Sequence, residues 1–285
     1  MTTPTTPTTL TTLTGNASKV LLVVHPTRED AKLYADELSN ALLGAGYEVS
    51  RDSAVGAEVA IVLGGDGTIL RAAQLCRDTN VPILGINLGS VGFMAEIRKP
   101  TVSEIVAALE NKTYKSEPRL VLRFVVERGG SQVADGWALN EVVIEGLPGA
   151  MISLFVQIDN RPLSRWGCDG VICATPTGST AYAFSAGGPV VWPEVPALVL
   201  LPIAAHALFS RPMVISPDST IAIDVESDDA LLSADGFRRT ELLACDRILI
   251  TRDDSTVSLA HIEHSPFTDR LVAKFKLPVE GWRGE

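Results

Sequence analysis

The sequence lacks the two best-known phosphate-binding patterns of nucleotide-binding proteins. It contains no G-x-x-x-x-G-K-[ST] segment, because no glycine in the chain is followed by lysine. It also contains no G-x-G-x-x-G, the turn that marks the usual dinucleotide-binding folds. No lysine occurs between Lys115 and Lys274, and the loop, lysine and H-R-D set of protein kinases is absent. P-loop enzymes, protein kinases and hydride-transferring oxidoreductases of the common type are therefore disfavoured.

Cysteine and positive charge are also scarce. Cys76, Cys168, Cys173 and Cys245 form no C-x-x-C pair, and no histidine spacing completes a zinc site. We expect them to be small buried hydrophobes in a reducing cytosol, so the predicted location is cytoplasmic. The formal net charge of −10 makes non-specific nucleic-acid binding unfavourable. Anionic substrates would have to be attracted locally, by backbone amides, a few arginines and a metal ion.

Long apolar runs and targeting signals are missing as well. The most apolar stretch, residues 189–208, is interrupted by prolines, Glu194 and His206, so it is too broken to cross a membrane. Residues 1–17 are rich in threonine and proline and lack the features of a signal peptide. We expect these residues to be a disordered tail.

The remaining sequence has two textures. Residues 18–115 alternate apolar strands, such as 20–24, 59–63 and 82–87, with helical patterns at 28–43 and 101–110. This alternation predicts a Rossmann-like α/β domain with a parallel sheet. Residues 116–265 contain short alternating strands and hairpin signals, which predict a mainly antiparallel β-sandwich domain. We expect residues 266–285, an amphipathic segment, to pack back on the N-terminal domain.

A glycine turn is the most informative motif that is present. Gly64-Gly65-Asp66-Gly67-Thr68 follows the strand 59–63 and precedes a helical pattern over 69–76. Strand, glycine loop and helix direct backbone N–H groups and a positive helix end at one place, which suits a phosphate. Asp66 would repel a phosphate, so it could instead hold a cation or accept a proton. The plain alternative is a tight turn with Thr68 as the helix N-cap.

Three further clusters lie in the second half. Asn140-Glu141 follows an aromatic strand, and Asp169-Gly170 precedes the strand 171–174. The segment Thr175-Pro-Thr-Gly-Ser-Thr-Ala-Tyr182 is a hydroxyl-rich glycine turn. Amide and carboxylate groups can bind ribose hydroxyls or a base edge, and such a turn can hold phosphate or adenine through backbone groups. Taken singly, the first cluster could be a solvated strand end and the second a hairpin turn.

Taken together and in this order, the motifs closely resemble those of the NAD kinases, which transfer a phosphoryl group from ATP or polyphosphate to the 2′-hydroxyl of NAD. The resemblance covers nearly all of the chain from about Val20 onward. Residues 206–212 and 266–270 resemble the actinobacterial members. The G-G-D-G element is shared with lipid kinases of the diacylglycerol type, whereas T-P-T-G-S-T-A-Y in this order is far more specific.

The resemblance implies roles for particular residues. Asp66 would be the catalytic base and would also contact NAD. The other residues implied to bind NAD are Gly67, Arg71, Asn140, Glu141, Asp169, Thr177, Thr180, Ala181, Tyr182 and Ser185. The residues implied to hold the donor phosphates are Gly64, Gly65, Gly67 and Thr68. Mg²⁺, or another divalent cation, would be bound mainly by donor phosphates, with no metal site formed by protein residues alone.

The implied partners are NAD and either ATP or polyphosphate, in a homodimer or homotetramer, with no nucleic acid and no membrane. Two other hypotheses stay open. A lipid kinase would need a route to a membrane, and the acidic chain shows no basic or amphipathic anchor. A non-catalytic NAD sensor would gain nothing from the Asp66 carboxylate. The register of Asp235-Gly236 against the family pattern is also open.

Overall fold

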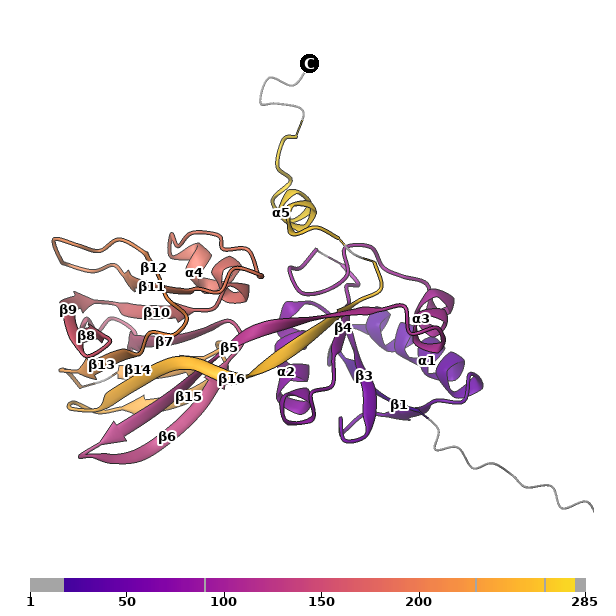
Figure 1. Cartoon of the computed structure of the whole chain (residues 1–285), viewed down its shortest axis with the longest axis horizontal. Helices are drawn as coiled ribbons and strands as arrows, with labels where there is room; N and C mark the ends of the chain where they lie inside the picture. The colour runs from indigo at the N-terminus through magenta and orange to yellow at the C-terminus, as the bar shows by residue number, and fades with distance from the viewer. Residues whose placement is uncertain (1–17, 90, 229, 264, 280–285) are drawn as a thin grey trace, which may run out of the picture.

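The computed structural model describes residues 18–89, 91–228, 230–263 and 265–279. The predicted tail at 1–17 and the end of the chain at 280–285 lie outside these residues. Figure 1 shows an N-terminal half of strands and helices beside a C-terminal half made almost entirely of strands. This arrangement matches the α/β and antiparallel β halves predicted from the sequence.

The N-terminal half carries a parallel sheet in the order β2-β1-β3-β4. Its elements are β1 (Lys19–Val24), α1 (Glu29–Gly44), β2 (Glu48–Ser50), β3 (Ala57–Leu63), α2 (Asp66–Cys76), η1 (Arg77–Thr79), β4 (Ile83–Ile86) and α3 (Val102–Glu110). Side chains alternate between the two faces of a strand. Val20 and Leu22 accordingly pack with α1 and α3, whereas Leu21 packs with α2 on the opposite face.

The C-terminal half is a sandwich whose buried cluster includes Leu122, Val142, Leu154 and Leu232 from strands of both sheets. Its strands are β5 (Lys115–Arg128), β6 (Ser131–Ala138), β7 (Glu141–Gly146), β8 (Ile152–Ile158), β9 (Arg161–Cys168), β10 (Gly170–Ala174), β11 (Leu198–Ile203), β12 (Met213–Ile215), β13 (Ile221–Val225), β14 (Ala230–Ala234), β15 (Arg238–Leu242) and β16 (Arg247–His261). Its helical elements are η2 (Thr177–Thr180) and α4 (Tyr182–Ser185). The second sheet has the order β12-β11-β10-β7-β14-β15.

One sheet runs through both halves. β16 pairs antiparallel with β5 over most of its length, and near its end Leu259 and Ala260 pair parallel with β4. β5, which begins at Lys115, extends from one half into the other (Figure 1). The glycine turn of the N-terminal half is thus positioned against the sandwich by hydrogen-bonded strands.

Some local expectations need correction. α2 begins at Asp66 with Gly65 as the N-cap, so Thr68 is not the cap and the helix starts three residues before the predicted 69. Asp169-Gly170 is no hairpin turn, because β9 and β10 belong to different sheets and Asp169 stands at the step between them. Cys76, Cys168 and Cys173 are buried as expected, but Cys245 is exposed, in a tight turn where its φ is 70°.

The final helix, α5 (Phe267–Phe275), contacts both halves. Its Phe267 and Phe275 rings contact Phe93 of the N-terminal half, and they also contact Trp192 and Phe184, respectively, of the sandwich half. Figure 1 shows α5 beside the junction between the two halves. No helix among the described residues is long and apolar enough to cross a membrane.

Candidate active site

The glycine turn forms a potential anion site at the carboxyl end of β3. Gly64 and Gly65 connect β3 directly to α2, with Gly65 extended at the N-cap. A Cβ on Gly64 would lie 2.4 Å from Thr68 Oγ1, so the turn is too tight for another residue. The first N–H groups of a helix have no intrahelical acceptor and carry the positive end of its dipole. The start of α2 therefore suits a phosphate.

The Asp66 carboxylate at this helix start is held by the loop that follows β4. Its Oδ2 accepts the N–H of Phe93 at 2.9 Å, and its Oδ1 accepts the N–H of Met94 at 3.1 Å. A Cβ on Gly92 would lie 2.3 Å from Asp66 Oδ1, so glycine is required for this close approach. Each oxygen keeps a lone pair after these bonds. The carboxylate is therefore fixed in place and can still accept a proton from a ligand.

Asn140 and Glu141 are buried where β7 begins, so they do not form a solvated strand end. Asp235 holds this backbone: its carboxylate accepts the N–H of Leu139 at 3.0 Å and that of Asn140 at 2.6 Å. The N–H of Asp235 donates in turn to the Glu141 carbonyl at 3.0 Å. Arg238 pairs with Asp235 and lies 4.1 Å over the Trp137 ring. We call this arrangement the Asp235 clamp.

Burial changes the protonation of Glu141. It raises the pKa of the Glu141 carboxyl to about 8, and the negative charge of Asp235 adds to the increase. The backbone N–H of Tyr182 donates to the carboxyl and opposes the shift. The group is thus mostly protonated at neutral pH without a ligand. Glu141 Oε2 and Asn140 Oδ1 are both buried with no hydrogen-bond partner in the described structure, so both atoms are available to a bound molecule.

The turn at 175–182 packs directly on Asn140. The Thr175 N–H donates to the Asn140 carbonyl at 2.8 Å, and Thr175 Oγ1 donates to the Leu139 carbonyl at 2.6 Å. A Cβ on Gly178 would lie 2.0 Å from the Asn140 carbonyl oxygen, so this contact needs glycine. Among the expected NAD-binding residues of this turn, Thr177 is buried, Thr180 and Ala181 are half-buried, and Tyr182 and Ser185 are exposed.

Packing brings the two glycine turns to one junction. Ile69 of α2 and Leu139, the residue before Asn140, belong to the same buried cluster. On the other side, Phe275 contacts both Phe93, whose N–H holds Asp66, and Phe184 of α4, with ring centroids 5.8 Å and 4.9 Å apart. Asp66 and the Asn140-Glu141 pair are thus connected by shared packing from two directions.

Two expected residues lie apart from this centre. Arg71 is exposed on α2, one turn beyond Asp66. Asp169 is exposed at the far end of β10 from Thr175, about 17–20 Å along the strand. The charges of Glu145, Asp169 and Glu141 nevertheless add to the effect of burial in raising the pKa of the Tyr182 phenol. Asp169 therefore lies within electrostatic range of the Tyr182 hydroxyl.

Sequence reasoning missed several groups that shape this site. Gly92 and Phe93 lie in the loop after β4, and Gly89 and Gly92 were the only sequence signal that this loop has a special role. The clamp residues Asp235 and Arg238 lie about a hundred residues from Asn140, and the Asp-Gly pair hinted at them without showing what they bind. Phe275 gave no signal beyond an amphipathic pattern.

The described residues hold no group of three or more histidine, cysteine, aspartate or glutamate side chains placed to bind a metal ion. At the glycine turn the donor set is one carboxylate surrounded by N–H donors, and N–H groups do not bind cations. These residues fit a Mg²⁺ ion that is held mainly by substrate phosphates and water.

The chain is similar to known proteins over most of its length. The family description "ATP-NAD kinase N-terminal domain" matches residues 48–114, and "ATP-NAD kinase C-terminal domain" matches residues 139–262. The chain is 52% identical to an NAD kinase of Thermobifida fusca, over 83% of this chain and 75% of that protein. It is 42% identical to an NAD kinase of Rhodococcus erythropolis, over 95% of this chain and 97% of that protein.

Solved structures show the same fold. The crystal structure of a yeast NADH kinase complexed with NADH has a TM-score of 0.81 at 22% identity, covering 93% of this chain and 89% of that one. An NAD kinase from Archaeoglobus fulgidus in complex with ATP has a TM-score of 0.70 at 27% identity, covering 91% of this chain and 98% of that one. These relatives define the chain as a kinase that acts on nucleotide substrates. The chain belongs to the NAD kinase family, and its relatives from actinobacteria confirm the resemblance found in the sequence.

Proposed function

We propose that the chain phosphorylates the adenosine 2′-hydroxyl of NAD, with Asp66 as the proton acceptor. The hydroxyl oxygen forms a bond to the terminal phosphorus of the donor, and the bond from that phosphorus to the leaving phosphate breaks. The hydroxyl proton passes to an Asp66 carboxylate oxygen. The supporting observation is that this carboxylate is fixed at the start of α2 by the N–H groups of Phe93 and Met94. Such a base is typically responsible for about 10²–10⁴ of the rate.

The buried pair at the start of β7 supports NAD binding. Asn140 Oδ1 and Glu141 Oε2 each lack a partner, and ribose hydroxyls or an adenine edge would provide one. A protonated Glu141 can donate one hydrogen bond as well as accept. The remaining residues proposed to contact NAD are those that the family resemblance implies: Gly67, Arg71, Asp169, Thr177, Thr180, Ala181, Tyr182 and Ser185.

The donor is ATP or polyphosphate, and its phosphates would meet the turn formed by Gly64, Gly65, Gly67 and Thr68. The N–H groups of Gly64 and Thr68 already donate to the carbonyls of Ile86 and Gly65, so the N–H groups of Gly65 and Gly67 are the proposed phosphate donors. Mg²⁺ bound to the donor phosphates would neutralise their charge. The chain's own contribution is positional, because α2 directs N–H donors at the phosphates while Asp66 stays held by the loop after β4. The archaeal relative crystallised with ATP supports a nucleotide donor.

The test is NADP formation from NAD by the purified chain with Mg²⁺ and either ATP or polyphosphate. We expect turnover with at least one donor, no turnover in excess chelator, and recovery with Mg²⁺ or Mn²⁺. NAD binding without NADP formation under all these conditions would support a sensor instead. Phosphorylation of diacylglycerol in vesicles without NADP formation would support the lipid kinase.

We also propose a cytoplasmic homodimer or homotetramer. Leu208 and Phe209, in the loop between β11 and β12, are strongly exposed, and Met151 before β8 is 61% exposed. Exposed apolar side chains of this size are common at protein interfaces. Light scattering coupled to size-exclusion chromatography would give the assembly state, and a monomer at micromolar concentration would contradict it.

A further inference from the structure

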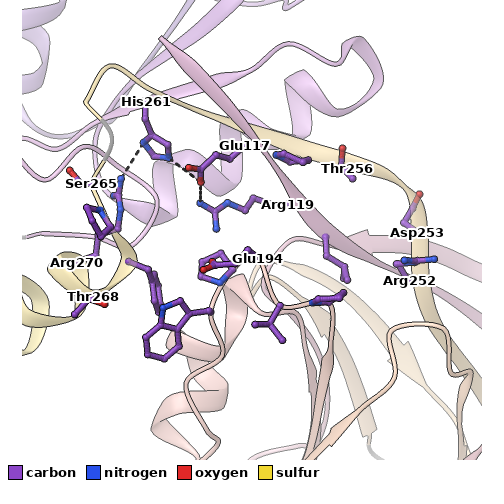
Figure 2. A pocket seen from close by; sticks show the side chains of 18 residues that line it. Glu117, Arg119, Glu194, Arg252, Asp253, Thr256, His261, Ser265, Thr268 and Arg270 are labelled. Carbon is purple, nitrogen blue, oxygen red and sulfur yellow. Dashed lines mark hydrogen bonds and ion pairs between the residues drawn. The ribbon is translucent and has the colours of Figure 1, made fainter.

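A cavity of about 760 Å³ lies beside the candidate active site and contains none of its residues. It is formed by β5, β16, the loop at 192–196 and the start of α5. Figure 2 shows Arg119 reaching toward its centre, with Glu117, His261 and Arg270 on one side and Arg252 and Asp253 on the other. Cavities of this volume are large enough for a nucleotide-sized ligand.

Two buried guanidinium groups line the cavity, and the protein supplies acceptors for only some of their N–H donors. Arg119 is 6% exposed; one of its amino groups donates to Glu117 at 2.8 Å, but its Nε has no partner in the described structure. Arg270 is 4% exposed and contacts the Ala95 carbonyl and the His261 imidazole. Burial lowers the pKa of both guanidinium groups, because a buried charge is costly without full compensation.

Nearby carboxylates offset part of this charge, because Glu117 and Glu194 act on Arg119, and Glu96, Glu117 and Asp66 act on Arg270. Asp253 pairs with Arg77, which lies outside the wall, and Glu194 is exposed at the rim. Glu117 pairs with Arg119 and also lies 4.0 Å from His261. Since a guanidinium has five N–H donors, Arg119 and Arg270 together offer more donors than these contacts use.

The rest of the cavity lining is aromatic and apolar. Trp192, 40% exposed, lies at the rim with its ring in edge contact with Phe267, and prolines at 118, 193, 196 and 266 complete the surface. A flat ring can stack on an indole, while an anionic group on the same molecule can reach the guanidinium groups. The charged and the apolar parts of the lining together therefore match a ligand that has both a flat ring and an anionic group.

We propose that this cavity is a second binding site, separate from the catalytic junction, for an aromatic ring that carries a phosphate or carboxylate, such as a nucleoside monophosphate. The site adjoins the catalytic loop through Arg270. The Ala95 carbonyl that this arginine contacts is one residue beyond Met94, whose N–H holds Asp66. An occupant that binds Arg270 would thus contact a residue that is hydrogen-bonded to the loop holding Asp66.

The test is calorimetric titration of the full-length chain with AMP as the probe, alone and with saturating NAD. We expect AMP to bind one site per chain that saturating NAD does not abolish. Arg119→Lys keeps the charge but loses the fork-shaped donor set, so it should weaken AMP binding about tenfold. Trp192→Ala should weaken AMP and adenosine similarly and leave the weaker binding of inorganic phosphate unchanged.

Arg165→Lys is the matched control, since Arg165 is exposed on β9 and pairs with Glu226 outside the cavity. It should bind AMP like the wild type. If Arg119→Lys fails to fold in a thermal melt, Trp192→Ala decides. Asp66→Asn should still bind AMP, so a failure of the catalytic proposal can be distinguished from a failure of this second-site proposal. AMP binding that NAD fully displaces, that both cavity variants retain, or that never saturates would overturn the proposal.

Discussion

The two halves of the candidate site are built in different ways. The Asp66 turn is mainly local: β3, two glycines and α2 follow one another, and the added contacts come from a loop less than thirty residues away. The Asn140-Glu141 pair is assembled from distant segments, with the 175–178 turn on one side and Asp235 and Arg238 on the other.

The electrostatic environments of Asp66 and Glu141 differ as well. Asp66 is only half-buried, and both of its oxygens have N–H donors. Glu141 is buried with an unpartnered oxygen, and its pKa is raised to about 8 by burial. A half-exposed carboxylate fixed in place is accessible to a substrate hydroxyl, whereas a buried, protonated carboxyl suits hydrogen bonding to neutral hydroxyls. Under the proposed function, the site separates chemistry, at Asp66, from recognition, at Glu141, by how deeply each carboxyl is buried.

The largest expected effect is on turnover, from Asp66→Asn. Asparagine keeps the shape but loses the basicity, and its amide cannot accept both loop N–H groups. We expect NADP formation to fall by about 10²–10⁴, while NAD affinity measured by calorimetry stays close to wild type. A variant that keeps more than about a tenth of wild-type turnover would contradict the general-base role.

The second prediction tests whether Asp235 positions Asn140 and Glu141. Asp235→Asn removes one acceptor from the clamp and weakens the pair with Arg238, so we expect a loss of about 2–4 kcal/mol in stability. Because Asn140 and Glu141 lose their support, the KM for NAD should rise more than kcat falls.

Asp246→Asn provides the matched control. Asp246 is a buried aspartate paired with Arg128 at 2.7 Å, and it accepts the Leu243 N–H in a turn before β16. It should cost similar stability in denaturant unfolding without changing the KM for NAD. Equal shifts of KM in both variants would mean that Asp235 is only structural.

The local turn around Asp66 could be predicted from the sequence better than the Asn140-Glu141 pair, because the pair is assembled from distant segments. Gly64 to Thr68 could be placed because the strand, the glycines and the helix are adjacent, and the errors there were confined to the helix start. The burial of Asn140 and Glu141 could not be foreseen, because it depends on pairing with β10 and on a clamp from β14 and β15. The α/β and sandwich halves were predicted from strand texture, whereas their shared sheet depends on the parallel pairing of β16 with β4, which no local pattern shows.

A third prediction concerns how closely the loop after β4 holds the Asp66 carboxylate. In Gly92→Ala the new Cβ would lie 2.3 Å from Asp66 Oδ1, so the carboxylate must move. We expect turnover to fall by about 10–100-fold, since small displacements of a reacting group are costly, with little change in NAD affinity. Gly44→Ala, where a Cβ meets nothing within 4 Å, is the control and should be silent. Unchanged turnover in Gly92→Ala would show that the carboxylate tolerates displacement.

The last expected effect is on the pH dependence of stability rather than on turnover, through Glu141→Gln. The folded-state pKa of Glu141, about 8, lies above the ordinary value of 4.5. Unfolding therefore releases a proton between these two values, and wild-type stability should fall as pH rises from 4.5 to about 8. Glutamine has no proton to lose, so this variant should gain roughly 2–3 kcal/mol on the wild type between pH 5 and pH 8. Glu145→Gln, four residues along β7, should show no such gain. Parallel stability curves for wild type and Glu141→Gln, measured by urea unfolding, would show that the carboxyl is ionised in the ligand-free protein and that the two halves of the site do not differ in this respect.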